Sequence, residues 1–402
     1  MLSLVLLVHL GVCLLFMCGA IPSFTLKVEN VSIPGLALYA GFLACFTVIV
    51  FALTRDVGPR QNELAETLAG IDYRRANLVI DLLLAVTVAG CAAIFFITIG
   101  GYSISDYLMA CISNDVRTNE DLEEGPFHLF IVFPMVCAPL LAISAERIPR
   151  PRLKILLVVL LAAYLGAVFG SRLVLFEVVF ALLVAAVRAR WYEVEFTLKT
   201  LLAIVALVAV LALIFVFVSG NRDYEDGGGY LYTNSVWVWG ISRALDYPLS
   251  TAIYASHALE LANPYSSIQV VFPTIARFFS NSNEGELFEF VNAFRSAYGQ
   301  AYYTNMSGIG QLIESCGVFS PLVASVCYCL SAYLFKRFDS GELVGLLVYP
   351  YILYTLFETW RTFYFFSETT QVVVVCLLLC SWFITRGDGE SEPVKTRVIP
   401  CA

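Results

Sequence analysis

Charged residues are scarce in this 402-residue sequence. Asp, Glu, Lys and Arg make up 14% of it, whereas soluble domains carry roughly a quarter. Hydrophobic residues make up 59%, and the mean hydropathy is +0.80. This composition excludes an ordinary soluble domain and predicts a polytopic membrane protein. The sequence also lacks a basic patch interleaved with aromatic residues, so we do not expect nucleic acid among its partners.

Motifs for metals and cofactors are missing as well. The 12 cysteines contain no CxxC pair and no His/Cys spacing typical of zinc. Most of them, such as Cys45 and Cys137, lie in apolar runs, where cysteine acts as a small packing residue. No nucleotide-binding glycine-rich loop is present. We therefore expect no disulfide scaffold, no structural metal and no cofactor.

Apolar runs recur along the whole chain, and a membrane-spanning helix needs about 20 such residues. The run at 155–187 is too long for one helix and too short for three, so we expect a hairpin that turns at Gly170 and Ser171. The first run lacks the basic segment of a secretory signal, so we interpret it as a span. We predict a single all-α transmembrane domain over residues 1–402, with about ten transmembrane helices. The runs lie near 2–21, 34–54, 77–100, 128–145, 155–171, 172–187, 200–219, 310–335, 342–360 and 368–385.

Basic residues predict the orientation. If the N-terminus is cytoplasmic, sixteen of the 24 basic residues lie inside, as the positive-inside rule requires, and the tail 386–402 is cytoplasmic too. Seven of the remaining eight are arginines, whose planar fork suits phosphate or carboxylate. The outer face is therefore predicted to recognise anions, although these arginines could instead pair with outer acidic residues such as Glu120. The eight are Lys27, Arg117, Arg172, Arg222, Arg243, Arg277, Arg295 and Arg361.

One predicted outer loop, 221–307, is much longer than the others and rich in aromatic rings. Such rings suit both the membrane interface and stacking on sugars. Within the loop, 243–261 has the apolar spacing of a helix that lies along the membrane surface, and 266–279 could form a second one, interrupted at Pro273. We expect these interfacial helices to cap a cavity for an outer-leaflet lipid or a molecule attached to one.

Two arginines interrupt apolar runs at the predicted outer helix ends. Arg172 follows the turn at 170–171, so its guanidinium can reach the interface instead of the midplane. Glu177 lies about 140° further around the helix, too far for an i,i+4 partner, and should pair elsewhere. Arg361 lies three residues after Glu358 on one helical face, where the two charges can neutralise each other.

Three short segments, in this order, resemble the oligosaccharide repeat-unit polymerases, the Wzy-type O-antigen polymerases. They are the Gly-Ser-Arg turn at 170–172, the aromatic-proline stretch YPLSTAIYA at 247–255, and TNMSGIGQLIESCGVFSPLVAS at 304–325. The resemblance covers nearly the whole chain in topology but only these pieces in sequence. Glu314 stands where aspartate is more usual, and Ser320 stands where glycine is. The matching positions of the third segment are Thr304, Gly308, Gly310, Glu314, Gly317 and Ser320.

The resemblance implies a glycosyltransferase of the bacterial inner membrane with a GT-C-like architecture. Such an enzyme acts at the periplasmic face on oligosaccharide units carried on undecaprenyl diphosphate. It transfers the growing glycan to a hydroxyl of a new lipid-linked unit, building O-antigen or a related surface polysaccharide. The implied partners are these lipid-linked oligosaccharides and the bilayer, with a chain-length regulator as a further candidate. No nucleotide is required, because the diphosphate is the leaving group.

Candidate site residues follow from that chemistry. Outer arginines can hold two lipid-linked anions together and stabilise charge on the departing diphosphate. A base near them would be Glu314 or His257, although His257 can equally be a hydrogen-bonded interface residue. The candidates for diphosphate binding, in order of preference, are Arg172, Arg361, Arg295, Arg277, Arg243 and Arg222.

Two other functions stay open at this point. An O-antigen ligase shares the many-span plan, the large outer loop and the lipid diphosphate donor, and differs in its acceptor. A lipid-linked oligosaccharide flippase or another transporter would carry polar residues along a path through the bilayer. Asp81 and Glu177, however, are nearly the only charges away from the predicted span ends.

Overall fold

The computed structural model of the chain describes residues 32–55, 61–99, 103–107, 126–169, 173–189, 233–261 and 307–385, with a few residues between 11 and 20 and at 213, 216 and 231. Within these ranges the chain is helical and no strand is present. An isolated antiparallel bridge joins Ile71 to Thr385. The prediction of an all-α protein is confirmed for this part of the chain.

The described helices differ widely in length. The α-helices are α2 (Ile33–Thr54), α3 (Gln61–Ala69), α4 (Tyr73–Thr98), α7 (Val132–Ser144), α8 (Pro151–Val168), α9 (Leu173–Ala189), α11 (Val236–Leu261), α14 (Gly308–Cys316), α15 (Ser320–Asp339), α16 (Leu343–Phe357) and α17 (Glu368–Ile384). The 3-10 helices are η2 (Pro126–Ile131), η4 (Gly317–Phe319), η5 (Glu358–Trp360) and η6 (Tyr364–Phe366).

Three of the described helices, α2, α4 and α8, are long and apolar enough to cross a membrane. Shorter apolar helices lie at Leu129–Ser144 and in α16 and α17. Large apolar side chains point outward from several of them: Phe51 of α2, Phe96 of α4 and Trp382 of α17 are 69%, 76% and 78% exposed. Extended apolar surface of this kind is unfavourable in water. The apolar helices therefore indicate a membrane protein.

Helices occupy eight of the ten apolar runs in the sequence, and the runs near 2–21 and 200–219 lie almost entirely outside the described residues. The expected hairpin has a helix on each side: α8 ends at Val168, α9 begins at Leu173, and the two pack against each other. Whether each of these helices spans the membrane stays a prediction.

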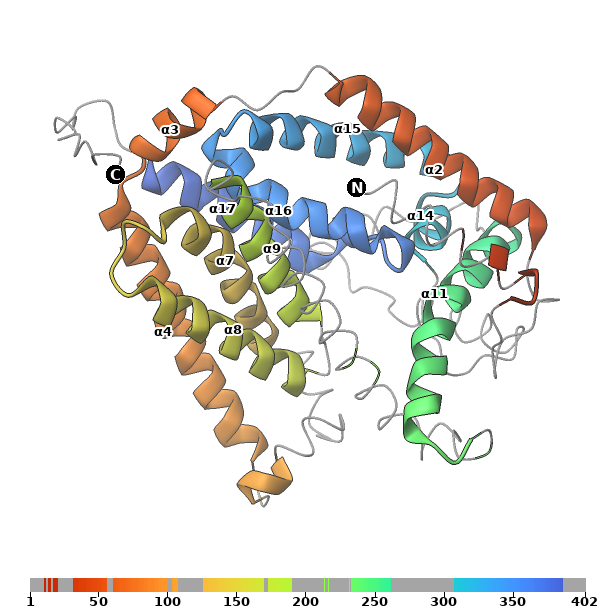
Figure 1. Cartoon of the computed structure of the whole chain (residues 1–402), viewed down its shortest axis with the longest axis horizontal. Helices are drawn as coiled ribbons and strands as arrows, with labels where there is room; N and C mark the ends of the chain where they lie inside the picture. Colours follow the sequence, from red (N-terminus) through yellow and green to blue (C-terminus); the bar gives the residue numbers. More distant parts are fainter. Residues whose placement is uncertain are drawn as a thin grey trace, which may run out of the picture.

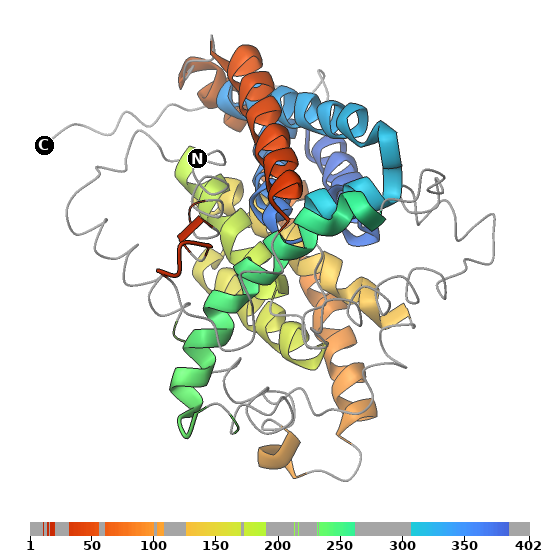
Figure 2. The ribbon, with the colours of Figure 1, turned by 90° about the vertical axis from the view of Figure 1, so that its right-hand side faces the viewer.

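The run predicted at 310–335 is not one helix. It forms α14 and α15, separated by η4, and Figure 2 shows the chain turning sharply between them. Gly317 has a positive φ of 49°, which glycine adopts at little cost and which ends α14. Pro321 then stands in the first turn of α15, where its missing N–H costs nothing. The apolar composition concealed this break, because hydropathy does not report backbone angles.

Helix α7 lies at the centre of one helix group. Twelve of its residues are buried, and it packs against α4, α8, α9, α16 and α17. Figure 1 shows α4, α7, α8 and α9 gathered on one side, with α2 and α11 on the other. Helix α2 packs against both α15 and α11.

Helix α11 belongs to the long predicted loop and begins seven residues before the predicted start at 243. It crosses α2 in direct backbone contact. The amide of Ser32 donates to Ser256 Oγ at 3.0 Å, and a Cβ added at Gly35 would overlap the carbonyl of Ser256. The loop helix is therefore anchored on the helices around it. The second helix predicted in the loop, at 266–279, lies outside the described residues.

Asp81 of α4, predicted as a charge inside a span, is paired with Lys154 in the first turn of α8. Lys154 Nζ lies 2.5 Å from Asp81 Oδ1. Asn77 joins the two side chains, since its amide nitrogen donates to Asp81 at 2.8 Å and its oxygen accepts from Lys154 at 2.6 Å. Asp81 is thus neutralised by the start of the neighbouring helix.

Candidate functional site

The candidate residues from the sequence fall into two groups. Arg361, Arg243 and His257 belong to the described part of the chain, and Glu314 belongs to α14 with its side chain outside that part. The other four candidates lie outside the described residues: Arg172, Arg222, Arg277 and Arg295.

Arg361 stands in a tight turn at the end of α16. The helix tightens into η5, and the amides of Arg361 and Thr362 both donate to the carbonyl of Glu358, at 2.8 and 2.9 Å. Thr359 Oγ1 donates back to the carbonyl of Thr355 at 3.2 Å. These bonds satisfy carbonyls that a helix end leaves unpaired, and they fix the direction in which the Arg361 side chain leaves the backbone.

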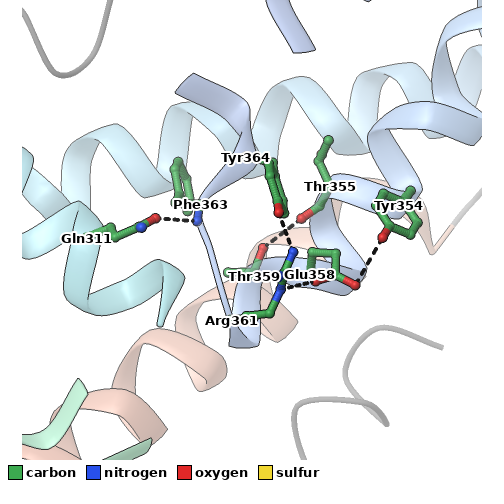
Figure 3. Close-up of polar contacts among 8 residues, drawn as sticks. All are labelled: Gln311, Tyr354, Thr355, Glu358, Thr359, Arg361, Phe363 and Tyr364. Carbon is green, nitrogen blue, oxygen red and sulfur yellow. Dashed lines mark hydrogen bonds and ion pairs between the residues drawn. The ribbon is translucent and has the colours of Figure 1, made fainter. Parts of the chain in front are cut away.

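The side chain of Arg361 forms a buried ion pair with Glu358. Arg361 Nε lies 2.7 Å from Glu358 Oε2, and the side chains are only 11% and 9% exposed. The Tyr354 hydroxyl donates to Glu358 Oε1 at 3.2 Å, and Arg361 Nη2 donates to the hydroxyl of Tyr364, as Figure 3 shows. The expected neutralisation of Glu358 and Arg361 is thus present, and both oxygens of Glu358 are engaged.

Glu177 of α9 joins this group from another helix. It is 5% exposed and lies close enough to Glu358 and Arg361 to interact electrostatically with both. The packing explains why: Phe180, one helical turn further on, contacts the rings of Tyr354 and Phe357 with centroids 5.6 and 6.1 Å apart. Among the residues that the structure describes, this cluster combines two carboxylates with one guanidinium.

Helix α14 packs directly against the Arg361 turn. The Gln311 side-chain oxygen accepts from the amide of Phe363 at 2.9 Å, a contact visible in Figure 3. A Cβ added at Gly308 would overlap the carbonyl oxygen of Thr359. Ser307 precedes the helix with a positive φ of 63° and caps it by accepting from the Gly310 amide at 3.0 Å. The third resemblance segment and the Arg361 turn therefore lie side by side.

Helix α11, which carries Arg243 and His257, packs against α14 and contacts η5. Arg243 is 8% exposed, and its guanidinium lies over the ring of Trp239, 5.8 Å from the centroid. Asp246 is fully buried on the same helix and accepts from Ser242 at 3.4 Å. His257 is half-buried. The elements that carry His257, Glu314 and Arg361 thus meet.

Several residues of this site were not singled out in the sequence. Tyr354 and Tyr364 bond to Glu358 and Arg361, and their spacing carried a signal: Tyr354 is four residues before Glu358, and Tyr364 is three after Arg361. Gln311 carried none, because its bond joins segments 52 residues apart.

Comparison with known proteins gives no relative: no family model, no curated protein and no solved structure matches the chain. Its function is therefore argued from the site itself. Within the described ranges, no group of three or more His, Cys, Asp and Glu side chains is placed to hold a metal ion.

The chemistry of the Arg361 turn is that of anion recognition. A guanidinium can bind phosphate through two parallel hydrogen bonds, and burial strengthens such bonds. Two of its partners, Glu358 and Tyr364, are side chains, which can rotate away when an anion competes for the guanidinium. Tyrosine hydroxyls can donate to the same anion.

Proposed function

We propose that the protein is a membrane glycosyltransferase of the O-antigen polymerase type. It transfers a growing glycan from undecaprenyl diphosphate to a hydroxyl of a new lipid-linked oligosaccharide unit. In this proposal the reaction takes place at the periplasmic face of the bacterial inner membrane. About ten transmembrane helices in a GT-C-like arrangement carry the site, both termini are cytoplasmic, and the loop 221–307 is periplasmic.

The observation that carries the proposal is the buried arginine turn beside α14. Arg361 is held at a helix end by Glu358 and Tyr364, and Gln311 ties this turn to the segment that resembles the polymerases. A transfer from a lipid diphosphate builds negative charge on the leaving group, and a buried, oriented guanidinium stabilises such charge. The apolar helices support a substrate that is itself anchored in a bilayer.

A lipopolysaccharide gel of a strain lacking the gene, with and without the gene supplied back, tests this function. We expect the deletion strain to show lipopolysaccharide with a single repeat unit, and the restored strain to show the full ladder. Lipopolysaccharide without any repeat unit would identify a ligase instead. An unchanged ladder would overturn polymerisation of O-antigen, and transport of lipid-linked units in vesicles without polymerisation would identify a flippase.

The orientation is tested separately with reporter fusions. A reporter fused after residue 250 should be periplasmic, and one fused after residue 338 should be cytoplasmic. The reverse pattern would place the Arg361 turn on the cytoplasmic side, where it could not meet a periplasmic substrate.

A further inference from the structure

The two carboxylates beside Arg361 differ in their bonding. Both oxygens of Glu358 are occupied, one by Arg361 Nε at 2.7 Å and the other by the Tyr354 hydroxyl at 3.2 Å. Glu177, although 5% exposed, accepts no hydrogen bond from the residues that the structure describes. The carboxylate of Glu177 is therefore open to a proton, whereas both oxygens of Glu358 are already engaged.

The position of Glu177 places this carboxylate near the end of the bundle that carries Arg361. It is the fifth residue of α9, about 6 Å along the axis from the first residue, Leu173. Phe180, three residues further along α9, packs on the end of α16, and Glu177 interacts electrostatically with Glu358, the first residue of η5. Glu177 is therefore within one and a half turns of the helix end that follows Arg172.

Among the described residues, the groups that act on Glu177 come from one side. From α16 and the turn after it come Tyr351, Tyr354, Glu358 and Arg361. Helix α7, which also packs against α9, has no charged residue. Helix α8 has its charged residues in its first turn, at the far end from the hairpin, and Tyr164 near its other end. The environment of Glu177 is thus dominated by the Arg361 site.

We propose that Glu177 is a catalytic residue of this site, the base that takes the proton of the acceptor hydroxyl; the inference rests on the proposed function. As the acceptor O–H bond breaks, the proton moves to the Glu177 carboxylate and the oxygen bonds to the anomeric carbon. The bond from that carbon to the diphosphate oxygen breaks, and its electron pair leaves with the diphosphate, beside Arg361.

Glu358 is not suited to the same task. Its oxygens orient Arg361 and bond to Tyr354, so accepting a proton would release the guanidinium that the leaving group needs. We therefore assign Glu358 to positioning and Glu177 to proton transfer. General bases contribute roughly 100-fold to 10,000-fold to such reactions.

The test uses the full-length protein in lipid nanodiscs with a lipid-diphosphate-linked repeat unit as substrate. The initial rate of chain elongation and the binding of the donor are measured for wild type and Glu177→Gln, which keeps the shape and removes the charge. We expect kcat to fall about 100-fold or more with little change in donor affinity. Glu66→Gln, at an exposed position of α3, is the matched control and should keep the wild-type rate.

Three outcomes decide the inference. A Glu177→Gln protein that elongates at half the wild-type rate or faster overturns it, whereas wild type that makes no polymer overturns the proposed function instead. If the Glu177→Gln protein does not bind donor, the pH dependence of the wild-type elongation rate decides. If Glu177 is the base, this rate should fall on acidification, and a rate that does not change with pH overturns the proposal. A Glu177→Ala protein that still binds donor should regain part of the elongation rate when formate is added. No gain in rate would also overturn the proposal.

Discussion

Arg188 and Arg361 lie at opposite ends of the layer formed by α9 and α16, the first buried and the second mostly buried, and they are held in different ways. Arg188, in the last turn of α9, is 7% exposed; its Nε donates to the carbonyl of Phe338 at 3.1 Å, and its Nη2 donates to that of Asp339. Those carbonyls end α15, so the arginine satisfies a helix C-terminus. Arg361 is held by a carboxylate and a hydroxyl.

The difference separates a structural arginine from one that can exchange partners. Backbone carbonyls at a helix end cannot move without unwinding the helix, so Arg188 is committed to α15. Glu358 and Tyr364 bond to Arg361 through side chains on short turns, and a phosphate can replace these two contacts without moving a helix. Burial alone does not distinguish the two residues. The chemistry of their acceptors does, and four substitutions test this difference between the two arginines.

The largest effect on chain length is expected from Arg361→Lys. Lysine keeps the charge but loses the planar fork, so it cannot bond to Glu358 and Tyr364 through two separate nitrogens, or bind a phosphate through two parallel bonds. We expect long chains to disappear, a loss of at least about 100-fold in transfer, while the protein level on an immunoblot stays near normal. A full ladder at a normal level would show that the site needs only a charge.

Gly308→Ala should have the next largest effect. Its Cβ would overlap the Thr359 carbonyl oxygen, which is backbone and cannot rotate away, so α14 has to move off the Arg361 turn. We expect destabilisation of about 1–3 kcal/mol and markedly shorter chains. Gly41→Ala on α2, which meets nothing within 4 Å, is the matched control. Equal ladders from the two variants would disprove the close packing of α14.

Gln311→Leu should reduce transfer moderately. Leucine cannot accept from the amide of Phe363, and an unsatisfied amide costs about 1–3 kcal/mol. The turn then loses its tie to α14, and elongation in nanodiscs should slow several-fold. Gln311→Glu retains an oxygen acceptor and should stay closer to wild type. Slower transfer by the Glu variant than by the Leu variant would contradict this role.

Arg188→Lys should have the smallest effect on transfer and a clear effect on stability. Lysine can serve one of the two α15 carbonyls well but not both, so we expect a loss of about 1–2 kcal/mol, seen as a lower melting temperature. At equal protein level the ladder should remain complete. Loss of long chains in a stable Arg188→Lys protein would remove the distinction between the two arginines.

Local features of the site could be predicted from sequence. Glu358 and Arg361 are three residues apart, and a helical turn brings such positions together whatever surrounds them. The helices themselves follow from long apolar runs, since a backbone without water must bond to itself. The distribution of basic residues likewise predicts the orientation of the chain in the membrane. This orientation stays a prediction until the reporter fusions are measured.

Contacts between distant segments were decided by the tertiary structure. Glu177 lies near Glu358 because α9 packs the face that carries Phe180 against α16. Gln311 meets Phe363 because the chain breaks at Gly317, so that α14 is a separate helix from α15. The sequence determined that apolar helices form and where charges interrupt them. Only the packing decided which charges meet. A uniformly apolar helix can turn any face toward its neighbour at nearly equal hydrophobic gain, so the shape complementarity of the side chains selects the face that is packed.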